Sequence, residues 1–187
     1  MTHPRTVPMA LLAALLLATL AACGIGASSN PGSFPASPEE LQGLIPEEVN
    51  GIALERLSMR GNEFVSSGQA TDETQQFLEG LGVSPDAISV AAGFGAAQDG
   101  RLAVVFIFRA DGAAPDRLLA AFQDAAAEER GAALGWQPAT VGGKTVERAM
   151  DPGEPGQSLY LYARESVLVF VAATEQDDAA KVLEAMP

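Results

Sequence analysis

The chain has 187 residues, of which 48% are hydrophobic and 19% are charged, a balance typical of a globular protein rather than a disordered one. Its formal net charge of −13 repels phosphate backbones and no basic stripe offsets it, so we expect no nucleic-acid partner. The single cysteine is Cys23 and the single histidine is His3. Beyond Cys23 the chain therefore lacks the side chains for disulfides, thiol nucleophiles, and histidine-based catalysis or zinc binding.

The first part of the chain carries a targeting pattern. Arg5 precedes an Ala- and Leu-rich stretch over 7–22, and this stretch of about 16 residues is shorter than the ~20 that a membrane-spanning helix needs. It matches the apolar region of a secretion signal, with an uncleaved membrane anchor as the alternative. The stretch leads into the residues Leu20, Ala21, Ala22 and Cys23.

These four residues resemble the lipobox of bacterial lipoproteins, in which an aliphatic residue and two small residues precede a modified cysteine. The resemblance implies that 1–22 are a signal peptide and that Cys23 carries acyl chains, palmitate among them, which anchor the protein to a membrane. Gly24 stands where an Asp often marks inner-membrane retention in Gram-negative lipoproteins. The implied location is the extracytoplasmic face of a bacterial membrane, and the outer membrane if the cell is Gram-negative.

Residues 24–38 are small, polar and Pro-rich, without the periodicity of a helix or a strand. We expect residues 23–38 to form the lipidated cysteine and a flexible tether that spans about 20 Å. The folded part is expected to be a single domain over 39–187, large enough to bury about two thirds of its unfolded surface.

The sequence of the first half of this domain predicts a strand over 49–61, followed by a helix, a hairpin and a second helix. The hairpin pairs 88–94 with 102–108 through a turn at Asp99-Gly100, because the first run alternates and the second is apolar on both faces. One helix precedes it and one follows it. The first starts near Asp72, ends at Gly82 and buries Phe77, Leu78 and Leu81. The second has Pro115 near its first turn, ends at Gly131 and buries Leu118, Leu119, Phe122 and Ala126.

The second half repeats this order without the inserted helix. A strand over 141–153 precedes a hairpin that pairs 158–163 with 167–172. The last helix is expected to begin at Thr174, with Asp177 close to completing a capping box. Its buried face consists of Ala179, Val182, Leu183 and Met186.

The two halves also share residues, since Glu55-Arg56 and Glu147-Arg148 lie at matching places in 49–61 and 141–153. We interpret this as an internal duplication of a β-β-β-α unit, with pseudo-repeats at about 45–131 and 135–187. The predicted fold is α+β: a mostly antiparallel sheet of about six strands with helices packed on one face. Chance similarity between two amphipathic stretches is the alternative explanation.

The repeated Glu-Arg pair is the first candidate site. A salt bridge repeated by pseudo-symmetry is one interpretation. The other is a ligand site at the repeat axis, where Arg56 and Arg148 together bind an anion.

Three further features have competing interpretations. Val-Gly-Gly-Lys-Thr at 141–145 resembles the end of a phosphate-binding loop but lacks its earlier glycine, so we favour a turn into a strand. The loop at 151–157 is acidic without the spacing of a calcium loop, which favours a solvated hairpin. Trp136, Tyr160 and Tyr162 are either core residues or an exposed aromatic patch for a sugar or a protein.

We expect a membrane-anchored lipoprotein that is not an enzyme, needs no cofactor or metal, and acts as a binding module for an envelope protein or a small ligand. One alternative is a carrier of an apolar molecule between sheet and helices, suggested by the apolar runs 104–108 and 167–170. Another is a hydrolase that uses only Asp and Glu. Apart from the lipobox, the chain resembles only uncharacterised secreted bacterial proteins, over about 50 residues: a Gly-Gly-Lys strand, a Tyr-rich strand and a last helix ending in Pro. That resemblance implies no activity.

Overall fold

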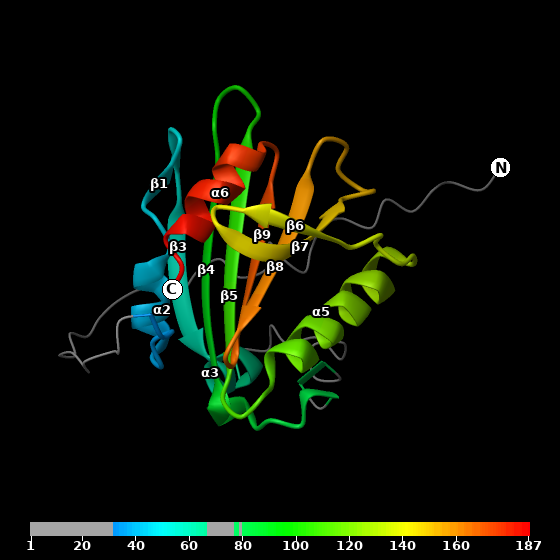
Figure 1. Ribbon diagram of the computed structural model, residues 1–187. Helices are drawn as coiled ribbons and strands as arrows, with labels where there is room; N and C mark the ends of the chain where they lie inside the picture. Colours follow the sequence, from blue (N-terminus) through cyan, green and yellow to red (C-terminus); the bar gives the residue numbers. More distant parts are fainter. Residues whose placement is uncertain (1–31, 67–76, 79) are drawn as a thin grey trace.

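The computed structural model describes residues 32–66, 77, 78 and 80–187. Its main element is an antiparallel sheet in the order β3-β4-β5-β9-β8-β7-β6, with helices packed against it (Figure 1). The α+β class predicted from the sequence is thus confirmed, with seven strands in place of about six. The strands are β3 (Glu55–Arg60), β4 (Ile88–Ala96), β5 (Leu102–Ala110), β6 (Gln137–Val141), β7 (Lys144–Met150), β8 (Ser158–Arg164) and β9 (Val167–Ala173).

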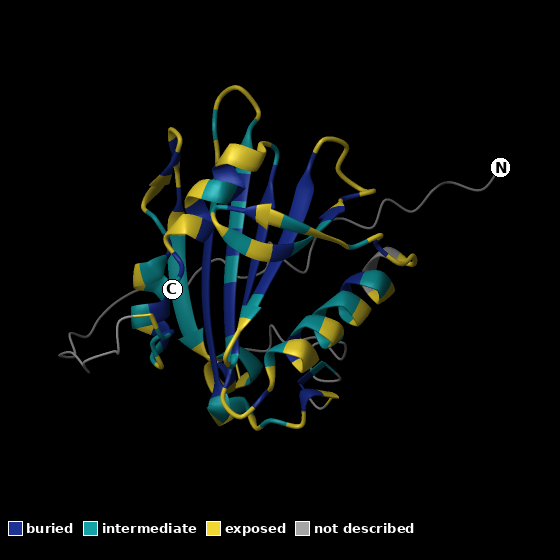
Figure 2. Cartoon of the chain, viewed as in Figure 1, coloured by how far each residue is buried: buried dark blue, intermediate teal, exposed yellow. Residues whose placement is uncertain are grey.

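The helices cover both faces of the sheet, which differs from the single covered face we expected. On one face lie α2 (Pro38–Leu44) and α6 (Gln176–Glu184), and on the other lies α5 (Pro115–Arg130). Strand β9 shows why, because alternate residues enter opposite cores. Its valines face α6 and its Leu168 and Phe170 face α5, with every residue of the strand buried (Figure 2). Strands that are apolar on both sides need cover on both sides.

Smaller elements lie at the two ends of the sheet. A short hairpin, β1 (Glu48–Val49) and β2 (Ile52–Ala53), lies at one end, and its turn is Asn50-Gly51. A helix α3 (Gly61–Ser66) and a single 3-10 turn, η1 (Pro85–Ala87), lie at the other end (Figure 1). We call the end with the β1–β2 turn the upper end and the end with α3 and η1 the lower end.

The sheet contains two three-stranded meanders, β3-β4-β5 and β7-β8-β9, that meet through their last strands, and β6 adds a seventh strand beside β7. One row of residues crosses the six strands of the two meanders. In order it contains Leu57, Ala92, Phe106, Phe170, Leu161 and Glu147. Glu147 therefore takes the place of Leu57 rather than Glu55, so the two Glu-Arg pairs are displaced by two residues in the ladder. The helices α5 and α6 that follow the meanders also lie on opposite faces, so the similarity is confined to the strands.

Helix α5 follows its sequence pattern closely. It begins at Pro115, ends at the left-handed Gly131, and buries Leu118 completely. The earlier helix is described only near its end, where Leu78 and Leu81 are buried and Gly82 has a positive φ. Its expected start at Asp72 lies outside the described residues.

Helix α6 has the expected buried face, with Ala179, Val182 and Leu183 completely buried. Its start differs from the expected capping box. The N-cap is Glu175, without a side-chain cap bond, and Thr174 Oγ1 instead accepts a hydrogen bond from the Leu102 amide. The threonine ties the chain just before the helix to Leu102, the first residue of β5.

Part of the expected tether is folded. Phe34 is 4% exposed and contacts the ring of Tyr162, with the ring centroids 6.4 Å apart. Arg109 Nη1 donates hydrogen bonds of 3.2 Å to the carbonyl oxygens of both Phe34 and Pro35, and Ser89 Oγ donates to Ala36 O at 3.2 Å. We call residues 33–37 the N-terminal strap. The domain therefore begins before residue 39, and only the residues before the strap remain to link it to Cys23.

Candidate functional site

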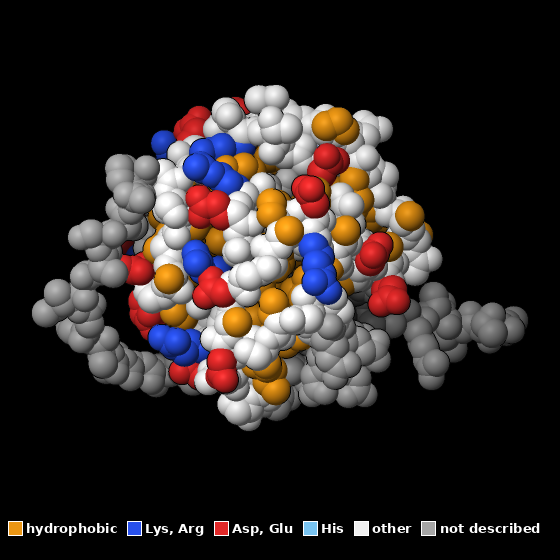
Figure 3. All heavy atoms as spheres, turned by 60° about the horizontal axis from the view of Figure 1, so that its bottom comes forward, with side chains coloured by type: hydrophobic (Ala, Val, Ile, Leu, Met, Phe, Trp, Pro, Cys, Tyr) orange, Lys and Arg blue, Asp and Glu red, His pale blue; other side chains and the backbone are white. Residues whose placement is uncertain are grey.

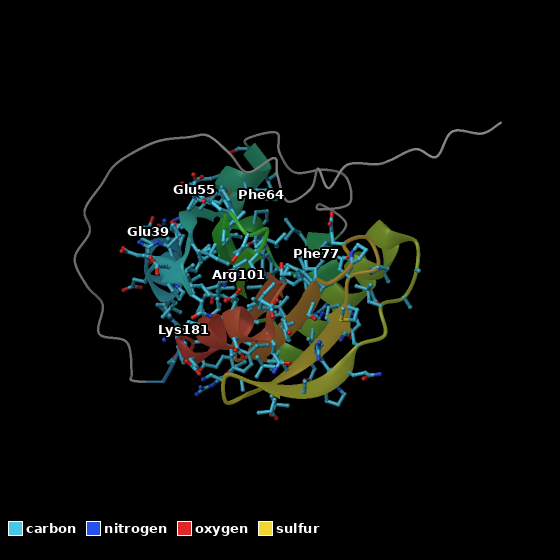
Figure 4. The ribbon with its side chains drawn as sticks, turned by 90° about the horizontal axis from the view of Figure 1, so that it is seen from above. Glu39, Glu55, Phe64, Phe77, Arg101 and Lys181 are labelled. Carbon is cyan, nitrogen blue, oxygen red and sulfur yellow. The ribbon has the colours of Figure 1, made fainter. Side chains whose placement is uncertain are left out.

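A hollow lined mostly by charged side chains lies at the upper end of the sheet. A surface depression of about 500 Å³ forms where the start of α6 meets the β1–β2 turn and the residue before β5. Figure 4 looks down on this end, with Arg101 beside α6, which carries Lys181. The depression is lined by Asn50, Arg101, Glu175, Asp177, Asp178, Ala180, Lys181 and Glu184.

Asp178 is the centre of this arrangement. Its side chain is only 1% exposed, so its charge needs partners. Asn50 Nδ2 donates to Oδ1 at 2.7 Å, and Arg101 Nη1 lies 3.5 Å from Oδ2. The residue also lies in the first turn of α6, where the free amides and the helix dipole favour a negative charge. Asp178 therefore joins three elements that are distant in the sequence.

Arg101 links this carboxylate to the β4–β5 turn. Its Nε donates to Asp99 Oδ2 at 2.9 Å, and its Nη2 donates to the Asn50 carbonyl oxygen at 3.3 Å. The Arg101 amide also donates to Asp99 Oδ1, and this bond and the guanidinium bond hold the pKa of Asp99 below its ordinary value of 3.8. The bond to Asp99, with the Asp178 charge beside it, raises the pKa of Arg101. Both groups remain charged at neutral pH.

The carboxylate at the centre of the depression is fully partnered. Both oxygens of Asp178 are engaged, by Asn50 and by Arg101, and its side chain is buried. The exposed lining carries Glu175, Asp177 and Glu184 against Lys181, which is a net negative surface. Among the described residues, no group of three or more His, Cys, Asp or Glu side chains is placed to hold a metal ion.

The structure does not bring Arg56 and Arg148 together. Both point to the α6 face, but β4, β5, β9 and β8 lie between their strands, so they are about 24 Å apart. Arg56 binds Glu47 at 2.7 Å and the Ile45 carbonyl oxygen at 3.0 Å. The prediction of a joint anion site at the repeat axis is therefore wrong. The two meanders pair through their last strands, which places their first strands far apart.

Arg148 has different partners from Arg56. It donates to Ser158 Oγ at 3.1 Å and lies over the Tyr160 ring, 5.9 Å from the centroid. The expected repetition of one salt bridge is thus not seen, since only Arg56 pairs with a carboxylate. The displacement of the two pairs by two residues in the ladder explains this difference.

The Gly-Gly-Lys run is a turn, as we favoured. Gly142 and Gly143, with φ of 56° and 72°, connect β6 to β7 in a two-residue hairpin. Gly142 also lies against α6, since a Cβ there would be 2.5 Å from the Ala180 carbonyl oxygen. These glycines therefore form a turn that packs against the last helix, and they do not form a phosphate-binding loop.

Tyr160 and Tyr162 are buried, which agrees with the core interpretation. Tyr162 donates from its hydroxyl to the Pro187 carbonyl oxygen at 3.1 Å, whereas the Tyr160 hydroxyl has no partner. Trp136 Nε1 and the amide of Gln157 also lack partners. Tyr160 belongs to the core on the α6 face, whereas Trp136 packs against the core on the α5 face.

In the loop at 151–157, Asp151 is buried and accepts a hydrogen bond from the Gly153 amide at 2.9 Å, so its carboxylate orders the turn.

Sequence reasoning missed the depression. Asn50-Gly51 is a hairpin signal that could have located the β1–β2 turn. No signal connects Asn50, Arg101 and Asp178, because their meeting depends on the strand order and on the face that α6 takes.

Within residues 32–66, 77, 78 and 80–187, no helix has the length and apolarity to cross a bilayer. Comparisons of the chain with protein-family models, curated proteins and solved structures find no match.

Proposed function

We propose that this protein is a lipid-anchored module of the bacterial cell envelope, held to the extracytoplasmic face of a membrane through Cys23. The observation that carries the proposal is the single cysteine of the chain, placed after Leu20-Ala21-Ala22 at the end of an apolar stretch. The folded domain begins at the strap, about ten residues later, which leaves a short link between anchor and domain.

The module acts by binding rather than by catalysis, and its contact region is the depression around Asp178. This region combines a rigid, hydrogen-bonded centre with exposed charges of both signs, which suits a polar contact with another envelope component. The hydrolase alternative lacks support here, because the most enclosed carboxylate is occupied by Asn50 and Arg101.

The apolar-carrier alternative is weakened by the packing around the runs that suggested it. Val105, Ile107 and Val169 belong to one packed cluster, and Phe108 and Phe170 belong to the other. Side chains from α6 and α5 fill the space against these strands. The two runs are explained by a sheet that is covered on both faces.

The anchor is tested by expressing the full chain in a bacterium that processes lipoproteins. We expect an intact mass of residues 23–187 plus acyl chains, and partitioning into the detergent phase. The Cys23→Ala variant should lose both. A parent protein that keeps residues 1–22, or that stays in the aqueous phase, contradicts the proposal.

The contact region is tested by photo-crosslinking in living cells. A photoreactive amino acid at Lys181, in the depression, should give discrete adducts, and the same group at the exposed Asp86 of η1 should not. Charge reversal by Glu184→Lys should abolish the adducts formed from position 181. Adducts that persist in this variant, or that form only from position 86, contradict the assignment of the depression.

A further inference from the structure

The strap determines where the link to the anchor leaves the domain. Ser33 Oγ donates to Glu165 Oε2 at 3.2 Å, and Glu165 lies in the turn between β8 and β9. Arg109, which holds the next two carbonyl groups, is the second-last residue of β5, and Ser89 is the second residue of β4. All these contacts are at the lower end of the sheet, because β5 runs from the upper end to the lower end.

We infer that the strap orients the domain on the bilayer, with the lower end toward the membrane and the depression around Asp178 facing away. The inference rests on the proposed anchoring through Cys23. Its geometric basis is the opposite placement of two features: the strap contacts at the end of β5 and the depression beside the start of β5. The surface offered to an envelope partner is then the charged upper end.

The length of the link supports this orientation. Ten peptide links separate Cys23 from Ser33, and even a fully extended chain of that length reaches no more than about 36 Å. Strand β5 has nine residues and is therefore about 30 Å long. To bring the depression to the bilayer, the link would have to extend along nearly its full length beside the domain. Few chain conformations satisfy that condition, so the reversed orientation is disfavoured by entropy.

The strap is held firmly enough to act as the exit point. Phe34 is buried against Tyr162, and three hydrogen bonds hold its own carbonyl group and those of Pro35 and Ala36. Arg109 is itself oriented by Asp111, 2.7 Å from its Nε. A segment with an anchoring aromatic ring and a guanidinium on its backbone shifts only when these contacts break.

At the lower end, no large apolar side chain among the described residues is well exposed. Figure 3, which brings the lower end forward, shows basic and acidic side chains interspersed with small apolar patches. Among the described residues, the only large hydrophobic side chain that is well exposed is Met150, on β7. The orientation therefore depends on the strap and the link rather than on insertion into the bilayer.

The test measures how far each end of the domain lies from the membrane. Asp86→Cys labels the lower end and Gln98→Cys labels the upper end, each with the sole unacylated thiol of the chain. The lipidated proteins are placed in phosphatidylethanolamine–phosphatidylglycerol vesicles, and energy transfer to headgroup-labelled acceptor lipids is measured. Transfer from position 86 should exceed transfer from position 98 at least about twofold, since the ends are about 30 Å apart.

Two further variants examine the cause. Phe34→Ala releases the strap and should reduce the difference. Ten Gly and Ser residues inserted between Asn30 and Pro31 lengthen the link without touching a strap contact, and should bring the two signals close to equality. Equal transfer in the parent protein, while it still partitions into detergent, overturns the inferred orientation and leaves the lipid anchor standing. Absence of lipidation, shown by mass, overturns the proposed function and the orientation together.

Discussion

The two faces of the sheet are covered in different ways. On the α5 face a helix of 16 residues covers β8 and β9, and Leu78 and Leu81 of the segment before η1 join the same core. Strand side chains such as Val104 and Phe106 remain half-buried. On the α6 face three separate pieces, α2, the strap and α6, leave Val105, Ile107 and Val169 with no exposed surface.

The difference shows that short segments need specific contacts in order to cover one face of a sheet. The long amphipathic helix α5 is held mainly by its apolar stripe, with one hydrogen bond from Arg117 Nη2 to the Gly80 carbonyl oxygen, whereas the pieces on the α6 face have several specific attachments. The strap has Arg109, α6 has Asn50 on Asp178 and a close contact with Gly142, and the chain after α6 has the Tyr162 hydroxyl. Breaking those attachments should therefore cost more than equivalent changes on the α5 face.

The largest effect is expected from Phe34→Ala. The ring is 4% exposed, and its removal leaves a cavity against Tyr162 that α2 and α6 cannot fill, at a cost of about 3–4 kcal/mol in the free energy of unfolding. The matched change on the α5 face is Phe122→Ala, where the half-buried ring should cost about 1–2 kcal/mol. Urea denaturation followed by Trp136 fluorescence measures both, and equal losses would mean that the two faces do not differ.

Gly142→Ala should come next, at about 3 kcal/mol. The added methyl group meets the Ala180 carbonyl oxygen, in addition to the strain of a positive φ. Gly143→Ala is the control, because this residue has the same backbone conformation but open space around it, and strain alone costs about 1 kcal/mol. A loss at Gly143 as large as that at Gly142 would remove the close contact with α6 from the argument.

Asp178→Ala is expected to cost about 2 kcal/mol, because Asn50 loses its acceptor and Arg101 keeps only Asp99 as an ionic partner. Asp177→Ala changes an exposed carboxylate in the same helical turn and should cost less than about 0.5 kcal/mol. Thermal unfolding of the two variants gives the comparison. Similar melting temperatures would show that the attachment of α6 to the β1–β2 turn adds little.

The two tyrosines of β8 should respond in opposite directions to loss of the hydroxyl group. Tyr162→Phe removes a bond to Pro187 and should destabilise by about 1 kcal/mol. Tyr160→Phe removes a buried hydroxyl that has no partner, and should be neutral or stabilising by about 1 kcal/mol. Chemical denaturation measures both, and a destabilised Tyr160→Phe variant would reveal a partner for that hydroxyl.

The smallest effect concerns the dependence of stability on pH. Because the folded protein lowers the pKa of Asp99, this carboxylate adds stability above its ordinary value of 3.8, and the contribution is lost as the pH falls through the lowered folded-state value. The parent should melt slightly higher than Asp99→Asn at pH 7, and the two should converge once the pH is below the lowered folded-state pKa. A difference that persists at the lowest pH would not come from this carboxylate.

The sequence predicts the helices and strands whose apolar residues recur with a regular spacing. The hairpins β4–β5 and β8–β9 and the helices α5 and α6 follow from alternation, apolar stripes and helix-ending glycine or starting proline. The short β6 was missed because Pro138 and its exposed neighbours give it no apolar pattern. The strap was missed for a similar reason, since Phe34 stands alone between small residues and prolines and its burial depends on β4, β5 and β8.

The candidate site was beyond sequence reasoning for a different reason. The Glu-Arg pairs drew attention because they repeat, but a repeated pattern fixes neither the register nor the side of the sheet on which each copy lies. Asn50, Arg101 and Asp178 do not repeat and follow no motif. Their meeting is a property of the assembled topology.

The position of the strap also constrains the order in which the protein matures. Phe34 is among the first residues of the domain to be synthesised, yet its ring rests on Tyr162, and the neighbouring Ser33 bonds to Glu165, near the end of the chain. No partial chain that stops before β8 can bury Phe34. Closure of the α6 face is thus one of the last events of folding, and an incomplete chain leaves this face of the sheet open.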